Sequence, residues 1–175
     1  LRAAGRTPKN KKGEDVNWLC PSHPENFAVE RDSMLEVARD YGVDGIHFDY
    51  IRYPNADGCF CGGCRERFEQ SAGTKVDKWP DEVLTGKQAE AFGDWRREQI
   101  TRLVRAVSQE AHKIRPGIKV SAAVFGNWES ARRVVGQDVK AWVDAGYLDF
   151  VCPIDYESAD ADFSMIREGI SLYGY

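Results

Sequence analysis

The sequence has no long hydrophobic run, no excess of basic residues and no glycine-rich phosphate-binding motif. None of its apolar segments approaches the roughly 18 residues that a helix needs to cross a membrane, and the first residues lack the charged-then-apolar pattern of a signal peptide. The 24 Lys and Arg residues are outnumbered by 28 Asp and Glu residues, for a net charge of -4, which argues against a nucleic-acid partner. Because neither G-x-G-x-x-G nor a phosphate loop follows an apolar run, the nucleotide-binding α/β folds lose support.

Apolar residues instead follow helix-type and strand-type patterns in turn along the 175 residues. The pattern predicts loops over 5–25 and 51–63, a short helix over 64–70, irregular chain over 71–86, helices over 26–41, 88–114, 138–145 and 163–172, and strands over 43–50, 119–125 and 148–154. Strands separated by helices pair in parallel. The predicted class is therefore α/β, either an open doubly wound sheet or a (β/α)₈ barrel. Three strands cannot close a barrel, so a barrel would make residues 1–175 a fragment of one catalytic domain.

A histidine and an acid share one face of the first predicted strand. Side chains alternate along a strand, so His47 and Asp49 point to one side while Ile46 and Phe48 point to the other. Burying two polar side chains on one face of an otherwise apolar strand costs free energy unless they form hydrogen bonds or take part in a function. The strand end therefore predicts a functional site.

Five cysteines cannot all pair internally, and they divide naturally into four and one. Cys152 lies in an apolar run and is expected to be a small buried core residue. The other four are either two disulfides, unrelated thiols, a C-x-x-C redox pair or a structural zinc site. Zinc explains the count best, because three cysteines within six residues are poorly placed to pair with one another. The predicted zinc ligands are Cys20, Cys59, Cys61 and Cys64, and His23 could substitute for one of them.

The segment after the first strand also carries a resemblance to a known family. Residues 45–54 (GIHFDYIRYP) resemble the fourth-strand signature of the glycosyl hydrolase-like family ten, a group of TIM-barrel proteins related to glycosidases. Residues 124–128 (VFGNW) resemble the end of that family's fifth strand, with Ala123-Val124 in place of Ser-Pro, and residues 149–156 (DFVCPIDY) resemble the end of its sixth strand.

This resemblance covers residues 26–175. It implies a partial (β/α)₈ TIM barrel that contains approximately strands four to six, with residues 1–25 as the loop after strand three. Tyr50 stands where some relatives carry a second acid, so the role of that acid does not transfer to this chain.

The cysteine arrangement has a resemblance of its own. One distant cysteine followed by C-x-C-x-x-C is similar to the zinc site of some β-galactosidases of family forty-two, which also lies beside a barrel's active-site mouth. Four thiolates close a tetrahedral site and leave no position for water. The resemblance therefore implies a structural zinc ion that joins the loops after strands three and four.

The resemblance to glycosidases implies hydrolysis of glycosidic bonds in a polysaccharide, with bacterial cell-wall glycan as a candidate substrate. That chemistry needs one ionised and one protonated carboxyl group. Asp49 near Arg52 would be ionised and fits the nucleophile or base. Its partner would be Asp155 or Glu157 after the last strand, with Glu129 as a further candidate. The alternative is that Asp49 is a structural carboxylate bonded to Arg52 or to a backbone amide.

Aromatic and polar side chains near the strand ends are predicted to contact a sugar. Aromatic faces stack on pyranose rings, although a ring in apolar surroundings usually belongs to the core. The candidates are His47, Arg52, Tyr53, Trp128 and Tyr156. Two rival hypotheses are a carbohydrate-binding barrel without the acid pair and a zinc-stabilised interaction module. The sequence does not fix a cellular location, for which the resemblance points to the secreted or periplasmic space.

Overall fold

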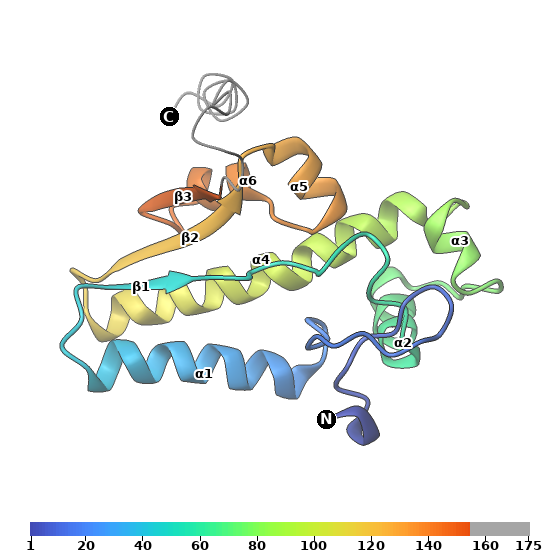
Figure 1. Ribbon diagram of the computed structural model, residues 1–175, viewed down its shortest axis with the longest axis horizontal. Helices are drawn as coiled ribbons and strands as arrows, with labels where there is room; N and C mark the ends of the chain where they lie inside the picture. The colour runs from blue at the N-terminus through green and yellow to red at the C-terminus, as the bar shows by residue number, and fades with distance from the viewer. Residues whose placement is uncertain (155–175) are drawn as a thin grey trace.

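The computed structural model describes residues 1–154, which form a three-stranded parallel sheet with helices packed against it (Figure 1). The strands are β1 (Gly45–Phe48), β2 (Lys119–Phe125) and β3 (Phe150–Ile154), in the order β1-β2-β3. The helices are α1 (Pro24–Asp40), α2 (Gly62–Ala72), α3 (Asp81–Leu84), α4 (Ala89–Ile114), α5 (Trp128–Val134) and α6 (Val139–Asp144), and Arg2–Ala4 form a short 3₁₀ helix. The predicted α/β class with parallel strands is confirmed.

The two faces of the sheet differ in burial. Both strand pairs are parallel, and residues paired in register present their side chains to the same face. Ile46 and Phe48 of β1 are buried in the main core together with Val120, Ala122 and Val124 of β2. On the opposite face His47, Phe150 and Cys152 of the outer strands are exposed, whereas Ser121 and Ala123 of β2 are buried. The sheet is thus covered on one side, and the face that carries His47 is open in the described part of the chain.

Helices α1 and α4 supply most of the cover. They lie side by side below β1 (Figure 1), and α4 buries Ile100, Val104, Val107 and Ala111 at intervals of three and four. Each buried aliphatic side chain of this size contributes about 1.5–3 kcal/mol relative to an exposed one. Arg115, just after α4, donates to the carbonyl oxygens of Tyr41 and Val43, which fixes the end of α4 beside the entry to β1.

A second, smaller core supports the long segment between β1 and α4. It is built from Phe60, Phe68, Val76, Val83 and Phe92, with Trp79 and Trp95 packed against it. The rings of Phe68 and Phe92 meet edge to face with centroids 5.1 Å apart, a favoured geometry for an aromatic pair. This core holds α2 and α3 at the end of the molecule where the N-terminal segment also lies (Figure 1).

Three expectations change in the structure. Helix α3 lies in the segment predicted to be irregular. Helix α5, which has seven residues, was not predicted. It begins after Asn127, whose side chain accepts a hydrogen bond from the Ser130 amide at 2.9 Å. Cys152 is exposed rather than buried. It pairs in register with Ala123 and so lies on the open face, which an apolar run alone does not reveal. The helix predicted over 163–172 lies outside the described residues.

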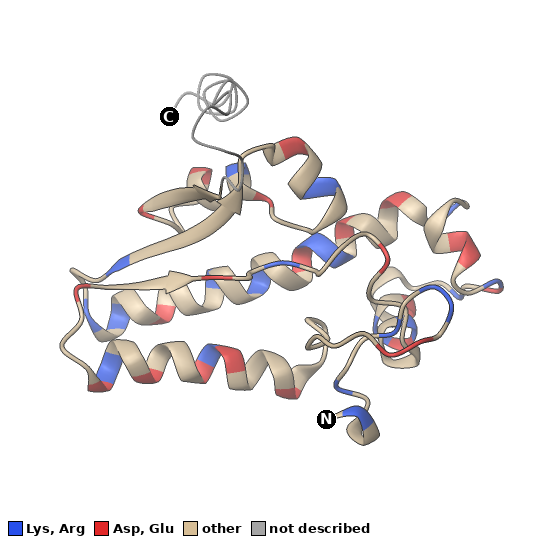
Figure 2. Cartoon of the chain, viewed as in Figure 1, with Lys and Arg blue, Asp and Glu red and all other residues tan. Residues whose placement is uncertain are grey.

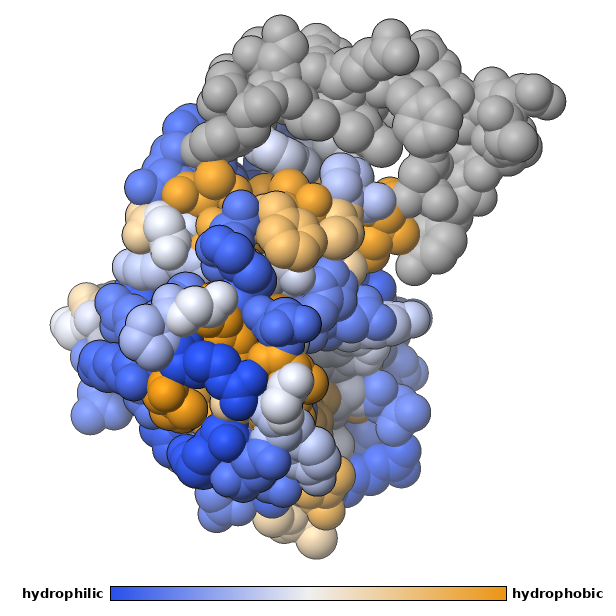
Figure 3. Space-filling view, turned by 90° about the vertical axis from the view of Figure 1, so that its left-hand side faces the viewer, coloured by the Kyte–Doolittle hydropathy of each residue, from blue (hydrophilic) through white to orange (hydrophobic). Residues whose placement is uncertain are grey.

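The surface shows no concentration of one charge along the helices. Figure 2 shows Lys and Arg interspersed with Asp and Glu along α1 and α4. Hydrophobic atoms gather at the level of β2 and β3 in the space-filling view (Figure 3), where Phe150 is 51 % exposed. None of the described helices is long and apolar enough to cross a membrane.

Candidate functional site

The carboxyl end of β1 brings His47 and Asp49 to the open face of the sheet. Both residues are exposed, while Ile46 and Phe48 between and beside them are buried. The imidazole Nδ1 of His47 lies 2.8 Å from the hydroxyl of Ser121 on the neighbouring strand. This contact fixes the histidine ring on the same face as the acid.

The backbone turns sharply immediately after Asp49. Tyr50 has a φ of 54°, a left-handed conformation that is uncommon for a residue other than glycine. Its amide donates to Asp49 Oδ1 at 2.8 Å. The alternation of the strand therefore ends at this residue: the Tyr50 ring is 57 % exposed, and Ile51 returns to the core at 6 %. Residues held in this conformation often occur at functional sites, where the surrounding structure supports the strain.

A cavity of about 520 Å³ lies beside this strand end. Its walls come from the N-terminal loop, α1, the end of β1 and the middle of α4. Phe48 and Ile51 line it from the covered side of the sheet, together with Trp18, His47, Asp49, Tyr50 and Arg52. A volume in this range is typical of small-molecule sites. One carboxylate oxygen of Asp49 accepts the Tyr50 amide, and no partner for Oδ2 is found within residues 1–154.

Arg52 lies among aromatic rings. Its guanidinium carbon is 5.6 Å from the ring centre of Trp18 and 5.0 Å from those of Tyr50 and Phe125. Its Nη1 donates to the carbonyl oxygens of Tyr53 at 3.2 Å and Pro54 at 3.3 Å. The side chain is thus oriented by cation–π and backbone contacts, and the Asp49 carboxylate takes its hydrogen bond from the Tyr50 amide, as the structural alternative expected.

Two of the predicted sugar-contacting aromatic residues lie in the core. Tyr53 is 1 % exposed, and its ring lies 4.2 Å below the guanidinium carbon of Arg96. Trp128 is 6 % exposed at the start of α5. These placements favour a packing role for both rings. Asp155, Tyr156 and Glu157 lie outside the described residues.

Glu129, the further acid candidate, is a surface residue of α5. Its side chain is 73 % exposed, and it lies 3.7 Å from Arg133 one helical turn along. Such i,i+4 pairs are common on solvated helix surfaces. The geometry is that of an exposed helix acid.

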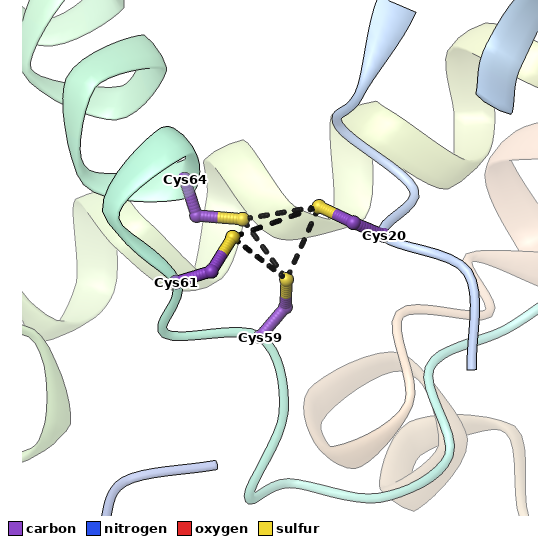
Figure 4. A group of neighbouring side chains, drawn as sticks. All are labelled: Cys20, Cys59, Cys61 and Cys64. Carbon is purple, nitrogen blue, oxygen red and sulfur yellow. Dashed lines mark hydrogen bonds between the residues drawn. The ribbon is translucent and has the colours of Figure 1, made fainter. Parts of the chain in front are cut away.

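The four predicted zinc ligands converge next to this cavity, which Cys20 also lines. Cys20 comes from the N-terminal loop, Cys59 and Cys61 from the segment before α2, and Cys64 from its first turn (Figure 4). The four side chains are buried, all are free thiols, and their sulfur atoms lie within 4.8 Å of one another. The Cys59 and Cys64 sulfurs lie 2.9 Å apart, and those of Cys20 and Cys61 lie 4.0 Å apart.

These distances suit a tetrahedral thiolate site. A Zn–S bond of about 2.3 Å places the sulfurs of a tetrahedral site about 3.8 Å apart. The closer pairs, at 2.9–3.4 Å, therefore need to open by about 0.4–0.9 Å. Disulfide bonds are about 2.05 Å long, which none of these sulfur pairs approaches. Four buried thiols at hydrogen-bonding distance therefore fit a metal ion better than two disulfides or a C-x-x-C redox pair.

The pKa values of the buried thiols are displaced in opposite directions. The hydrogen bond from Cys59 lowers the pKa of Cys20, whereas burial raises the pKa of Cys64. A cluster of thiols without a cation can therefore hold few thiolates, because each negative charge disfavours the next. A divalent cation removes that repulsion.

Ser22 and Arg67 contact the cluster at one side. The Ser22 hydroxyl, 2 % exposed, lies 3.3 Å from the sulfur of Cys20 and 3.2 Å from that of Cys64. Arg67 on α2 donates to this hydroxyl at 3.0 Å and 3.1 Å, and its Nη2 lies 3.8 Å from the sulfur of Cys20. A cation and a hydroxyl beside four thiolates compensate part of their negative charge.

His23 does not join the cysteines. Its Nδ1 accepts a hydrogen bond from the amide of Glu25 at 3.3 Å and so caps the start of α1. Trp18, Ser22 and Arg67 were not among the predicted site residues. Trp18 and Ser22 each lie two residues from Cys20, and this proximity to a predicted ligand is the signal that would have singled them out. Arg67 carries no such signal beyond its place one turn after Cys64.

The fold is one that occurs in glycoside hydrolase domains. The PgaB (BpsB) glycoside hydrolase domain of Bordetella bronchiseptica is similar with a TM-score of 0.74 at 13% sequence identity, over 97% of this chain and 52% of that chain. A β-galactosidase from Bacillus circulans sp. alkalophilus is similar with a TM-score of 0.65 at 15% identity, over 97% of this chain and 30% of that chain. At these identities the likeness is one of fold.

Sequence comparison defines the family more closely. The family model of glycosyl hydrolase-like 10 matches residues 5–167, and the chain belongs to this family, which confirms the predicted resemblance. Glycosyl hydrolase YngK of Bacillus subtilis (strain 168) is 25% identical over 159 residues, 81% of this chain and 28% of that protein. Glycosyl hydrolase DigH of Escherichia coli (strain K12) is 25% identical over 152 residues, 79% of this chain and 31% of that protein. The chain spans less than a third of the length of these relatives.

Proposed function

We propose that this chain belongs to a glycoside hydrolase that cleaves glycosidic bonds of a polysaccharide, with Asp49 as the ionised carboxylate that acts as nucleophile or base. The observation that carries the proposal is the placement of Asp49 with His47 on the open face of the sheet, at the carboxyl end of β1 and on the wall of a cavity. Barrel enzymes hold their catalytic residues at this end of their strands. Bacterial cell-wall glycan is the candidate substrate.

A comparison with a second acid of the same sheet supports this role. Asp149 lies before β3, at the opposite end of the strands, and accepts hydrogen bonds from Lys119 Nζ at 2.7 Å and from the Val120 amide at 2.9 Å. Those contacts join β2 to the start of β3, as a structural carboxylate does. Asp49 accepts one bond from its own neighbour and faces the cavity, which leaves Oδ2 for a substrate.

The sheet is proposed to be part of a (β/α)₈ barrel, with β1, β2 and β3 as approximately strands four to six. Helices on one face and polar groups on the other suit a barrel, in which the helices lie outside and the catalytic groups face the interior. The strand edges of β1 and β3 would then pair with further strands. The general acid is proposed to be Asp155 or Glu157, which follow β3 directly in the sequence.

The cysteine cluster is proposed to hold a structural zinc ion through Cys20, Cys59, Cys61 and Cys64. Four protein ligands fill a tetrahedral site, so the ion would stabilise loops and take no part in bond cleavage. It would join the N-terminal loop to the segment that follows the strand end of β1. Ordering two long loops is costly in conformational entropy, and a metal bond offsets that cost.

The effect of Asp49→Asn on turnover and on binding tests the catalytic role. The variant keeps the shape of the side chain and loses its charge, so hydrolysis of glycan strands should fall by at least about 10³-fold, about 4 kcal/mol in the barrier, while glycan binding persists. Asp44→Asn, the same change at the other end of β1, is the control and should retain wild-type turnover. Reducing-end release and calorimetric binding are the two measurements.

The same experiment separates the rival functions. A carbohydrate-binding barrel without catalysis shows glycan binding in all three proteins and turnover in none. An interaction module shows neither, and its partner binding depends on the cysteines alone. Wild-type turnover that survives in Asp49→Asn would contradict the proposed mechanism.

A further inference from the structure

Trp18 and Tyr50 form an aromatic pair at the mouth of the cavity. Trp18 belongs to the N-terminal loop and Tyr50 to the strand end, yet their ring centres lie 5.6 Å apart with an interplanar angle of 52°. Both rings line the cavity that Asp49 also lines. Tyr50 directly follows Asp49 in the chain, so whatever contacts its ring lies close to the carboxylate.

The pair is held firmly. Trp18 Nε1 donates to the carbonyl oxygen of Arg52 at 3.2 Å, and the guanidinium of Arg52 lies near both rings and near that of Phe125. Phe125 ends β2 on the same face of the sheet as Ser121 and therefore as His47. The aromatic pair thus stands at the carboxyl end of the open face and not on a remote surface.

The loop that carries Trp18 is anchored by the cysteine cluster. Two residues beyond Trp18, the sulfur of Cys20 contacts those of Cys59 and Cys64 at 3.3 Å and 3.4 Å. The carbonyl oxygen of Cys20 accepts a hydrogen bond from Asn26 at 3.0 Å. The position of the tryptophan is therefore coupled to the cluster through a very short stretch of chain.

We propose that Trp18 and Tyr50 form a saccharide-binding subsite next to Asp49, and that the metal-loaded cysteine cluster keeps Trp18 in this subsite. The inference rests on the proposed function for the identity of the ligand, a pyranose ring of the glycan. The apolar face of such a ring packs against aromatic faces, and its hydroxyls lie within reach of polar groups at the edge. The guanidinium of Arg52, which lies over one face of each ring, and the imidazole of His47 are the polar groups that line the same cavity.

Binding of defined glycan strands from bacterial cell wall, freed of peptides, tests the subsite. Affinities are measured by calorimetry in the Asp49→Asn background of the full-length protein, so that the strands stay intact. Trp18→Ala and Tyr50→Ala should each weaken binding by about tenfold or more. Tyr41→Ala is the matched control, because Tyr41 is also 57 % exposed but lies at the end of α1, before β1; this variant should bind as tightly as the parent.

Chelation tests the coupling to the cluster. Removing the metal should weaken glycan binding by a factor similar to that of Trp18→Ala, and should have little further effect on Trp18→Ala itself, because the contribution of that ring is already lost. Additive losses, or chelation that leaves the parent's affinity unchanged, would overturn the coupling. Loss of the helical circular-dichroism signal on chelation would also overturn it, since the cluster would then support the core and not Trp18 specifically.

The outcomes also separate this inference from the proposed function. If the Asp49→Asn protein binds the strands and Trp18→Ala binds them as well as Tyr41→Ala does, the subsite is wrong while the catalytic proposal stands. If no protein of the series binds the strands, both fail.

Discussion

The sulfur atoms of the cysteine cluster come from segments that lie far apart in the sequence, with Cys20 and Cys59 separated by 39 residues. Their convergence in a buried position follows from the packing of the N-terminal loop against the start of α2. Ser22 and Arg67 contribute polar contacts at one side of the cluster. The cysteine cluster therefore consists of four soft ligands and of polar groups that balance their charge.

The cluster predicts a definite metal content. Purified protein should contain one zinc ion per chain by elemental analysis, and Cys64→Ser should contain well under one, because three thiolates and a hydroxyl no longer make a closed soft site. Cys152→Ser is the control, since Cys152 lies on the open sheet face, and it should retain the metal. Hydrogen exchange of Cys64→Ser should rise in residues 5–25 and 51–63 before it rises in α4.

A disulfide between any two of the four cysteines in a crystal structure would contradict this account. Equal zinc content in Cys64→Ser and Cys152→Ser would do the same.

Much of the candidate site could be predicted from single residues, and the failures have physical causes. The alternation of side chains along β1 predicted that His47 and Asp49 share one face. The number and spacing of the cysteines predicted that four of them form one cluster. Tyr53 was predicted to face a sugar, but the chain turns at Tyr50, whose positive φ ends the alternation. A left-handed tyrosine carries no signal in the sequence, so the direction of every side chain after it could not be derived.

A buried acid of helix α2 forms hydrogen bonds with the segment that follows the helix. Glu69, 7 % exposed, accepts hydrogen bonds from Lys75 at 2.9 Å, from the Val76 amide at 3.0 Å and from Arg65 at 2.9 Å. The pKa of Glu69 is lowered from its usual 4.5 to about 2. The hydrogen bond from Lys75 is the largest cause, followed by those from the Val76 amide and from Arg65. The charged form is thus favoured in the folded state.

This shift predicts a pH-dependent contribution to stability. A carboxyl whose pKa is lower in the folded state stabilises the fold fully above its unfolded pKa, near 4.5, and loses that contribution as the pH falls towards 2. The melting temperature of Glu69→Gln should therefore lie below that of the wild type at pH 6, and the difference should shrink between pH 4.5 and pH 2. Thermal unfolding followed by circular dichroism measures it.

Glu66→Gln is the control, because Glu66 is an exposed residue of the same helix, and it should leave the melting temperature unchanged. A difference for Glu69→Gln that stays constant down to pH 2 would show that packing, and not charge, accounts for the effect.

The long elements could be predicted and the short ones could not. Helix α4 has a buried stripe that runs from Phe92 to Ala111, and its predicted bounds of 88–114 agree with Ala89–Ile114. Helices α3 and α5 have four and seven residues, too few for a periodic apolar stripe. Helix α5 depends on the Asn127 cap, and α3, which has no side-chain cap, depends on tertiary packing. The aromatic core around Phe92 could not be derived either, because its members are scattered from residue 60 to residue 92.

At the scale of the whole molecule, the sheet has one covered face and one open face. Membership of the glycosyl hydrolase-like 10 family and the fold shared with glycoside hydrolase domains agree with the prediction made from the strand ends. The α/β class followed from the alternation of helices and strands. The closure of the sheet into a barrel is a proposal, because it depends on strands beyond the three that the structure describes.

The distance between Asp49 and a second carboxyl group tests the two-carboxylate account most directly. In a crystal structure of the full-length protein, Asp155 or Glu157 should face Asp49 across the groove. The separation should be about 5–5.5 Å if the reaction retains the anomeric configuration, or roughly 6.5–9.5 Å if it inverts it. A structure in which no carboxyl group lies within about 10 Å of Asp49 would leave the mechanism without its acid and contradict the account.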